Sequence, residues 1–284
     1  MKAELYSVLR KTYFKYPFLQ PYMRFFNSLI QKQKPPKFSG WGMTTIHEFP
    51  WIGGDWNTFL KASHDIKNET CFTHSVEKES GINSKNVDTL LWRHWVVTFC
   101  IRYVLEFSDM NQGALNFVEC GVANGMSAFF ALREIQSLIK KRQSDDFIMH
   151  LYDCWSPMKE EHLLKDESGL TGSYADSSIE IPKKNLSEFK KQTIYHQGYI
   201  PDSLNQLPNS PETLLYLHID LNSAKATCAA LNFFYPRMSR GGIILFDDYG
   251  WESWESTKKA IDKFFSDKPG ILMKIPTGQA IYFR

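Results

Sequence analysis

The chain contains two apolar stretches that each end in acidic residues. Leu214–Ile219 is followed by Asp220, and Ile243–Phe246 is followed by Asp247 and Asp248. Runs of this length and composition are typical of buried strands in a parallel sheet. Because the carboxyl ends of parallel strands meet at one edge of the sheet, we expect the three carboxylates to converge there. Such a cluster predicts a site for a hard divalent cation or for proton-transfer chemistry.

A glycine-bearing turn lies upstream, where a strand-like run from Asn116 passes into a helical pattern. Glu119, Gly121 and Gly125 form the pattern E-x-G-x-x-x-G, which differs from the G-x-G-x-x-G fingerprint of dinucleotide binding. Glycines in such a turn let the backbone approach a ligand closely, and Glu119 is placed to accept hydrogen bonds from a cationic amine. A nucleoside that carries an amino acid fits this chemistry.

The rest of the chain predicts an α/β fold. The next strand, Phe147–Tyr152, ends at Asp153, where nucleotide-binding α/β folds place a carboxylate on the ribose hydroxyls. A loop carboxylate is the alternative for Asp153 taken alone. A helical pattern over 87–107 is expected to pack on the sheet, and strands alternate with helices from there, which predicts parallel pairing. Residues 271–275 and 279–283 predict a closing hairpin.

These motifs resemble the S-adenosylmethionine-dependent sugar O-methyltransferases of the macrocin and mycinamicin type, from about Asn116 to the C-terminus. The matching pieces are Glu119–Val122, Asp153, His196–Leu204, His218–Asn222, Tyr235–Gly242 and Asp247–Gly250. The resemblance implies a Rossmann-like class I methyltransferase fold: a mostly parallel seven-stranded sheet with a C-terminal antiparallel hairpin and helices on both faces.

The resemblance also implies site residues. Members of the family hold magnesium through three aspartates, and the matching positions are Asp220, Asp247 and Asp248. The loop from Gly121 would surround the methionine part of the cofactor, with Asp153 on its ribose. The expected cofactor-binding residues are Glu119, Gly121, Val122, Ala123, Asn124, Gly125, Ser127, Asp153, Cys154, Gly198 and Asp220.

One position departs from the family pattern. Where the family usually has Asp-x-Asp, with the second aspartate as general base, this chain has Asp220-Leu221-Asn222. An amide cannot take up a proton at neutral pH, so the base lies elsewhere, is dispensable or is absent. The catalytic candidates on this rim are Asn222, Asp248 and His196, with Glu252 and His218 as further possibilities. His218, inside a strand, is better explained as a packed core histidine.

Each acidic motif also has a structural interpretation. Asp247 and Asp248 precede a helical pattern at Trp254, Ile261 and Phe264, so they can serve as N-caps. Asp220, followed by Ser223, can likewise begin a helix. The coincidence of the two motifs favours a shared site.

We therefore predict a magnesium-assisted, S-adenosylmethionine-dependent O-methyltransferase that acts on a sugar hydroxyl of a glycan or glycosylated metabolite. The substrate class rests on the resemblance alone. A small-molecule acceptor such as a catechol is an alternative, because a metal suits a vicinal diol and a catechol equally. An inactive cofactor-binding interaction protein is a third hypothesis, based on Asn222 and on the aromatic N-terminal arm. The glycine spacing disfavours a nicotinamide dehydrogenase.

Composition limits the other possibilities. A chain of 284 residues with 43% hydrophobic content can bury a full core. A net charge of +2 argues against nucleic-acid binding as the main function. The five cysteines include no C-x-x-C pair, so neither a disulfide framework nor a zinc site is indicated. No long apolar run or signal-like segment is present, so we expect a cytoplasmic protein.

The domain prediction divides the chain into an N-terminal arm and cap region, 1–86, and a methyltransferase domain, 87–284. The first 38 residues combine basic and aromatic residues with a single acid, Glu4. Such an arm suits its own domain, a second subunit or an anionic membrane surface. Pro35-Pro36 marks a break, and the aromatic stretch 39–85 is expected to cover the substrate side. Residues 155–181 lack periodicity and predict a lid over the site.

Overall fold

The computed structural model describes residues 61, 64–66, 91–107, 115–139, 146–205, 210–251 and 255–284. The predictions about the arm, the Pro35-Pro36 break and nearly all of the stretch 39–85 lie outside these residues, as do Cys71, Glu252 and Trp254. Within the cap region, Ile66 is buried in the same hydrophobic cluster as residues of the helix Leu91–Phe107 and of the sheet.

Seven strands form one sheet in the order β3-β2-β1-β4-β5-β7-β6. The parallel strands are β1 Leu115–Cys120, β2 Phe147–Asp153, β3 Thr193–Gln197, β4 Leu214–Ile219 and β5 Met238–Phe246. The closing hairpin comprises β6 Ile271–Lys274 and β7 Ala280–Phe283, and β7 pairs antiparallel with β5. The predicted mostly parallel sheet with a C-terminal antiparallel hairpin is confirmed.

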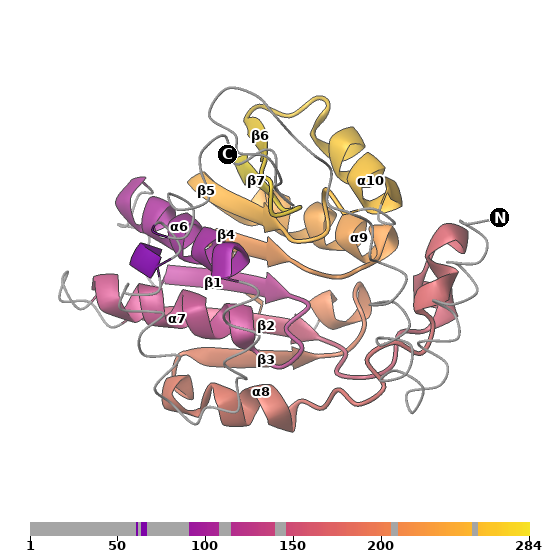
Figure 1. The fold of residues 1–284 in the computed structure, drawn as a ribbon, viewed down its shortest axis with the longest axis horizontal. Helices are drawn as coiled ribbons and strands as arrows, with labels where there is room; N and C mark the ends of the chain where they lie inside the picture. The colour runs from indigo at the N-terminus through magenta and orange to yellow at the C-terminus, as the bar shows by residue number, and fades with distance from the viewer. Residues whose placement is uncertain are drawn as a thin grey trace.

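Helices cover both faces of this sheet (Figure 1). They are α6 Leu91–Phe107, α7 Met126–Ile139, α8 Glu180–Asn185, α9 Ala224–Phe234 and α10 Glu255–Phe265. Short 3₁₀ turns occupy Glu160–His162, Lys165–Leu170, Ser187–Phe189, Asp202–Asn205 and Tyr235–Arg237. Alternation along β5 shows how the sheet separates two cores. Ile243 and Leu245 join the cluster beneath α6 and α7, whereas Ile244 and Phe246 join the cluster beneath α9 and α10.

The helical pattern over 87–107 runs through Leu91, Trp95, Phe99 and Tyr103, and of these four side chains only Leu91 is buried in α6. The aromatic residues at four-residue spacing, Trp95, Phe99 and Tyr103, are only half-buried, although they pack against the core. The fully buried stripe includes Val97, Ile101 and Val104 instead. The smaller aliphatic side chains fit against the sheet, while the large rings fill the margin of the interface. This rotation turns His94 inward and leaves Arg93 half-buried.

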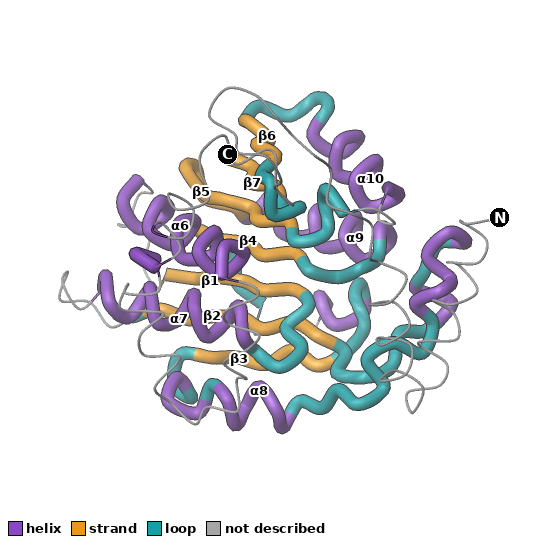
Figure 2. Tube along the Cα trace, viewed as in Figure 1, coloured by secondary structure: helices purple, strands orange, loops and turns teal. Residues whose placement is uncertain are grey.

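The carboxyl ends of β1, β2, β3 and β4 point to the same side of the molecule, at the right in Figure 1. The segment that joins β2 to α8, residues 154–179, runs past these ends before it turns back under β3 (Figure 2). This is the segment predicted as a lid. In the part of the chain that the structure describes, no helix is both long and apolar enough to span a bilayer.

Candidate active site

The turn after β1 is built around Gly121 and Asp153. Gly121 has a φ of +88°, and a Cβ at this position would lie 1.7 Å from the backbone oxygen of Asp220. Only glycine therefore fits between β1 and the end of β4. Asp153 Oδ2 accepts hydrogen bonds from the backbone N–H groups of Val122 and Ala123, at 2.7 and 2.8 Å. Its Oδ1 accepts from Trp155 N at 2.7 Å, so Asp153 holds the turn in shape.

Two cavities lie beside this turn. The larger, of about 550 Å³, extends from the turn toward α6 and the end of β5, and the smaller, of about 110 Å³, lies beneath the segment 154–179. Gly121, Ala123, Tyr174, Ser177 and Asp220 line both. The predicted cofactor residues divide between them: Glu119, Val122, Asn124 and Ser127 line the larger cavity, and Asp153, Cys154 and Gly198 line the smaller.

Gly125 is the predicted cofactor residue that lines neither cavity. A Cβ there would lie 3.2 Å from Leu186 and 3.3 Å from Pro182, and its φ is +85°. Gly125 therefore serves the packing of α7 against α8.

Glu119 is a buried acid with an unsatisfied oxygen. Its side chain is 1% exposed, and no group in the described part of the chain forms a hydrogen bond with its Oε2. Strand register places His218 beside it, with Nδ1 3.8 Å from Oε2. Burial raises the pKa of Glu119 above its usual range, while His218 acts in the opposite direction. Because an unpaired buried carboxylate is costly, this group is suited to receive a donor from a ligand.

Asp220, Asp247 and Asp248 converge as predicted. Each offers an oxygen, and these three atoms lie within 4.8 Å of one another. Burial raises the pKa of Asp220 to about 7, with the charge of Asp248 acting in the same direction. Burial also raises the pKa of Asp248 to about 6. The ionised forms of Asp220 and Asp248 are therefore disfavoured in the absence of a counter-charge, and a hard cation that prefers oxygen ligands would stabilise them.

Asp247 already has protein partners. Arg93 Nη2 forms an ion pair with its Oδ2, and Gln279 Nε2 donates to its Oδ1 at 2.7 Å. Arg93 Nη1 also donates to Thr277 O at 3.1 Å, and the guanidinium lies 5.0 Å from the ring centroid of Trp251. One charge of the trio is thus compensated from within the chain.

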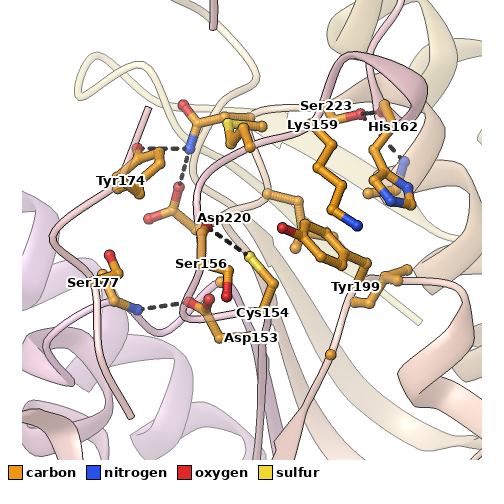
Figure 3. A pocket seen from close by; sticks show the side chains of 18 residues that line it. Asp153, Cys154, Ser156, Lys159, His162, Tyr174, Ser177, Tyr199, Asp220 and Ser223 are labelled. Carbon is orange, nitrogen blue, oxygen red and sulfur yellow. Dashed lines mark hydrogen bonds between the residues drawn. The ribbon is translucent and has the colours of Figure 1, made fainter. Parts of the chain in front are cut away.

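Asn222 links the acids to the lid. Its backbone N–H donates to Asp248 Oδ2 at 2.9 Å, and its φ of 53° lies in the left-handed region that asparagine tolerates. Its Nδ2 donates to Tyr174 Oη at 3.2 Å and to Asp220 Oδ1 at 3.4 Å. Figure 3 shows Tyr174 and Asp220 on one side of the smaller cavity. Asn222 therefore acts as a hydrogen-bond donor here.

The capping interpretation of these acids is not supported by the structure. Ser223, not Asp220, is the N-cap of α9, and its side chain accepts from Ala226 N. Helix α10 begins at Glu255, seven residues beyond Asp248. The acids therefore lie at the strand ends for a reason other than helix capping.

The two candidate histidines lie away from the cavity walls. His196 is 2% exposed, stacks on Tyr152 with ring centroids 4.0 Å apart, and has its Nε2 3.1 Å from His150 Nδ1. Burial lowers its pKa to about 4. His218 is fully buried between Glu119 and Asp247, with Nε2 3.6 Å from Asp247 Oδ1. This geometry gives His196 a packing role and His218 a place between two acids of the site.

The segment after β2 provides walls that the sequence did not indicate residue by residue. Lys159 and His162 from this segment, together with Tyr199 from the turn after β3, lie opposite Tyr174 in the smaller cavity (Figure 3). The rings of His162 and Tyr199 stack with centroids 4.6 Å apart. The side chain of Glu167 fixes this segment to α9: Oε2 accepts from Leu164 N and Oε1 from Ala224 N, both at 2.8 Å. The predicted position over the site is therefore correct.

The sequence-based search missed Arg93, His94, Tyr174, Trp251 and Gln279, which line the larger cavity. Arg93 and His94 look like ordinary helix residues in the sequence, and Gln279 belongs to the closing hairpin. No local motif marks them. The Trp251 position, three residues after Asp248, is the one that proximity to a motif would have suggested.

Comparison with known proteins agrees with this architecture. Residues 100–284 match the family model described as macrocin-O-methyltransferase (TylF). Among solved structures, the O-methyltransferase NovP is 22% identical with a TM-score of 0.56, and the match covers 68% of this chain and 79% of NovP. The calicheamicin methyltransferase CalS11 is 15% identical with a TM-score of 0.52, and the match covers 81% of this chain and 93% of CalS11.

No curated protein matches the chain. The family match extends over the sheet from β1 to β7 and includes the glycine turn, all three aspartates and Asn222. The chain therefore belongs to the macrocin-O-methyltransferase (TylF) family and is an S-adenosylmethionine-dependent O-methyltransferase.

Proposed function

We propose that the chain transfers a methyl group to a sugar hydroxyl with the assistance of a divalent cation held by Asp220, Asp247 and Asp248. The observation that carries this proposal is the convergence of three carboxylates at the strand ends, beside a cavity of about 550 Å³ whose wall includes Asp220 and Asp247. The sugar acceptor is supported by the family, whose model is named for a macrocin O-methyltransferase.

The two cavities suit the two ends of the cofactor. The smaller, beside Asp153, Cys154 and Gly198, would receive the adenosine. The larger, where Glu119 Oε2 accepts no hydrogen bond, would receive the amino acid and leave space for the acceptor. Asp153 already accepts three backbone N–H groups, so its contribution to the ribose would add to its role in shaping the turn.

Catalysis in this site is mainly a matter of positioning. The sulfonium of the cofactor is already an activated electrophile, so the protein holds the acceptor oxygen in line with the methyl group and excludes water. A cation at the trio would supply positive charge that lowers the pKa of a nearby acceptor hydroxyl, as magnesium and zinc do for water. Asn222 would orient Tyr174 and Asp220 through its amide N–H groups.

The proton of the acceptor requires a destination. Asn222 cannot receive it, and His196 and His218 lie outside both cavity walls. Asp248 lines neither cavity itself, but unlike the two histidines it belongs to the carboxylate trio, and its Oδ2 accepts the backbone N–H of Asn222, which lines the smaller cavity. Of the candidates that the structure describes, it is therefore the one best placed to receive the proton. An acceptor with an acidic hydroxyl, such as a catechol, would need less help from a base.

Metal dependence tests the proposal. Purified protein is stripped with chelator and assayed for methyl transfer to sugar and catechol acceptors across a magnesium titration, with Asp248→Asn and Asp247→Asn in parallel. We expect turnover of a sugar acceptor to return when magnesium is added. In each variant, the magnesium-dependent turnover should be lower by at least about a hundredfold. Cofactor binding by each variant, measured separately, controls for folding. Full activity in chelator would refute the metal assignment, and turnover of catechols alone would refute the acceptor class.

A further inference from the structure

His94 is a buried polar side chain that lines the larger cavity and has no hydrogen-bond partner among the described residues. It lies on α6, is 4% exposed, and lines the cavity with Glu119. In the described part of the chain, neither of its ring nitrogens forms a hydrogen bond. Its ring stacks on Phe130, with centroids 4.5 Å apart and planes 21° from parallel. A buried imidazole without partners is costly, so its position is best explained by a ligand that supplies them.

The chemistry of His94 restricts that ligand. Burial lowers its pKa to about 3, and the charge of Arg93 acts in the same direction. The ring is therefore neutral at physiological pH, with one N–H donor and one acceptor nitrogen. A neutral N–H in a desolvated cavity forms its strongest hydrogen bond with an anionic oxygen.

The residue on which His94 stacks belongs to the N-terminal part of a helix. Phe130, on which His94 stacks, lies one turn into α7, a 14-residue helix whose first turn contains no acidic residue. The N-terminus of a helix attracts anions through its dipole and its free N–H groups. Ser127, on this first turn, also lines the cavity. Glu119, Asp220 and Asp247, which belong to the strand ends, make another part of the same cavity wall negative.

A wall with a carboxylate oxygen that accepts no hydrogen bond in one place, and an imidazole without a hydrogen-bond partner near a helix N-terminus in another, is complementary to a zwitterionic amino acid. We propose that His94 donates its ring N–H to the carboxylate of the cofactor's methionine moiety, with Ser127 beside it, while Glu119 receives the ammonium. This assignment rests on the family's cofactor and on the placement of its amino acid in the larger cavity. His94 precedes the residues that match the family model, 100–284.

Arg93 is a less suitable partner for this carboxylate. Its guanidinium is already engaged by Asp247 and by Thr277 O, and it lies over the ring of Trp251. A second carboxylate there would have to compete with Asp247 for the same donors.

Calorimetric titration of the full chain with three ligands tests the proposal. S-adenosylhomocysteine has both the amine and the carboxylate, decarboxylated S-adenosylmethionine has only the amine, and 5′-methylthioadenosine has neither. We expect His94→Phe, which keeps an aromatic ring against Phe130, to weaken S-adenosylhomocysteine by about tenfold or more. The same change should leave the affinities of the other two ligands unaltered. Glu119→Gln is the matched variant and should weaken the two amine-bearing ligands but not 5′-methylthioadenosine.

His94→Asn, which keeps an N–H donor, is the second variant and should recover part of the affinity for S-adenosylhomocysteine. Equal losses for all three ligands in His94→Phe would assign His94 a structural role and overturn the proposal, as would no loss for any of them. If wild-type protein binds none of the three, the cofactor site itself is misassigned and the failure does not concern His94. Melting temperatures of His94→Phe, His94→Asn and Glu119→Gln identify any variant that is not folded.

Discussion

Arg93 and Asp247 form an ion pair between helix α6 and the end of strand β5. The pair brings a fixed positive charge into a group of three carboxylates that is otherwise suited to a cation. Gln279 holds the second oxygen of Asp247 at 2.7 Å, so this residue is the most constrained of the three. The protein therefore has a cationic group of its own where a metal would contribute charge.

Replacing Arg93 with methionine should strengthen divalent-cation binding. The change frees Asp247 Oδ2 and removes a positive charge from the neighbourhood of the trio. We expect the dissociation constant for magnesium or manganese, measured by calorimetry, to fall by about tenfold. Arg93→Lys, which keeps the charge, is the control and should show little change. Weaker binding in Arg93→Met would mean that the guanidinium is needed to hold Asp247 in place.

Asn222→Asp should increase kcat. Aspartate tolerates the left-handed backbone of this position and restores a proton acceptor beside the trio. A positioned general base typically contributes about a hundredfold or more to the rate. Single-turnover kinetics with a saturating acceptor would measure the gain, and Asn222→Ala is the control for loss of the bond to Tyr174. An unchanged or lower rate would place the base elsewhere.

Gly121→Ala should destabilise the protein far more than Gly172→Ala. Both glycines have a positive φ, +88° and +82°, so each substitution carries a left-handed strain of about 1 to 2 kcal/mol. Only at Gly121 does a Cβ also meet backbone, 1.7 Å from Asp220 O, whereas Gly172 has nothing within 4 Å. We expect the free energy of unfolding, from urea titration, to fall by about 2 kcal/mol more in Gly121→Ala. Equal losses would refute the close approach of β1 and β4.

His196 should make the protein less stable in acid. Its pKa is about 4 in the folded state, below the value of about 6.5 in the unfolded chain. The unfolded state therefore binds more protons between these values, so this contribution is complete above pH 6.5 and is lost as the pH falls toward 4. The slope is at most about 1.4 kcal/mol per pH unit. His196→Phe should reduce the difference in unfolding free energy between pH 7.5 and 5, and an unchanged difference would contradict the folded-state pKa.

Much of the fold could be predicted from local patterns. Strands β1, β2, β4 and β5 each contain a dense apolar run, and Asp220, Asp247 and Asp248 stand at strand ends, where topology alone brings them together. The closing hairpin was visible because Pro276, Thr277 and Gly278 separate two short apolar runs. These features arise from residues that are close in the sequence, so local patterns are enough to predict them.

The residues that could not be predicted act across long sequence separations. Arg93 reaches Asp247 over 154 positions and Thr277 over 184, and no periodicity records such contacts. The inward rotation of His94 follows from packing: Val97 and Ile101 fit the sheet better than the larger rings of Trp95 and Phe99. His196 was misleading because a polar residue at a strand end resembles a site residue, although its ring is paired with His150 within the sheet.

The Glu167 side chain has a consequence for how acceptor preference can change. Since it joins Leu164 to the start of α9, one margin of the entrance is fixed to the first turn of that helix, which begins two residues after Asn222. The opposite margin is open at Gly172, where a Cβ would meet nothing within 4 Å, and it is joined to the site by the hydrogen bond from Asn222 to the half-exposed Tyr174. We expect divergence among relatives to concentrate on that margin, where new side chains can meet a new acceptor at little cost to the catalytic centre.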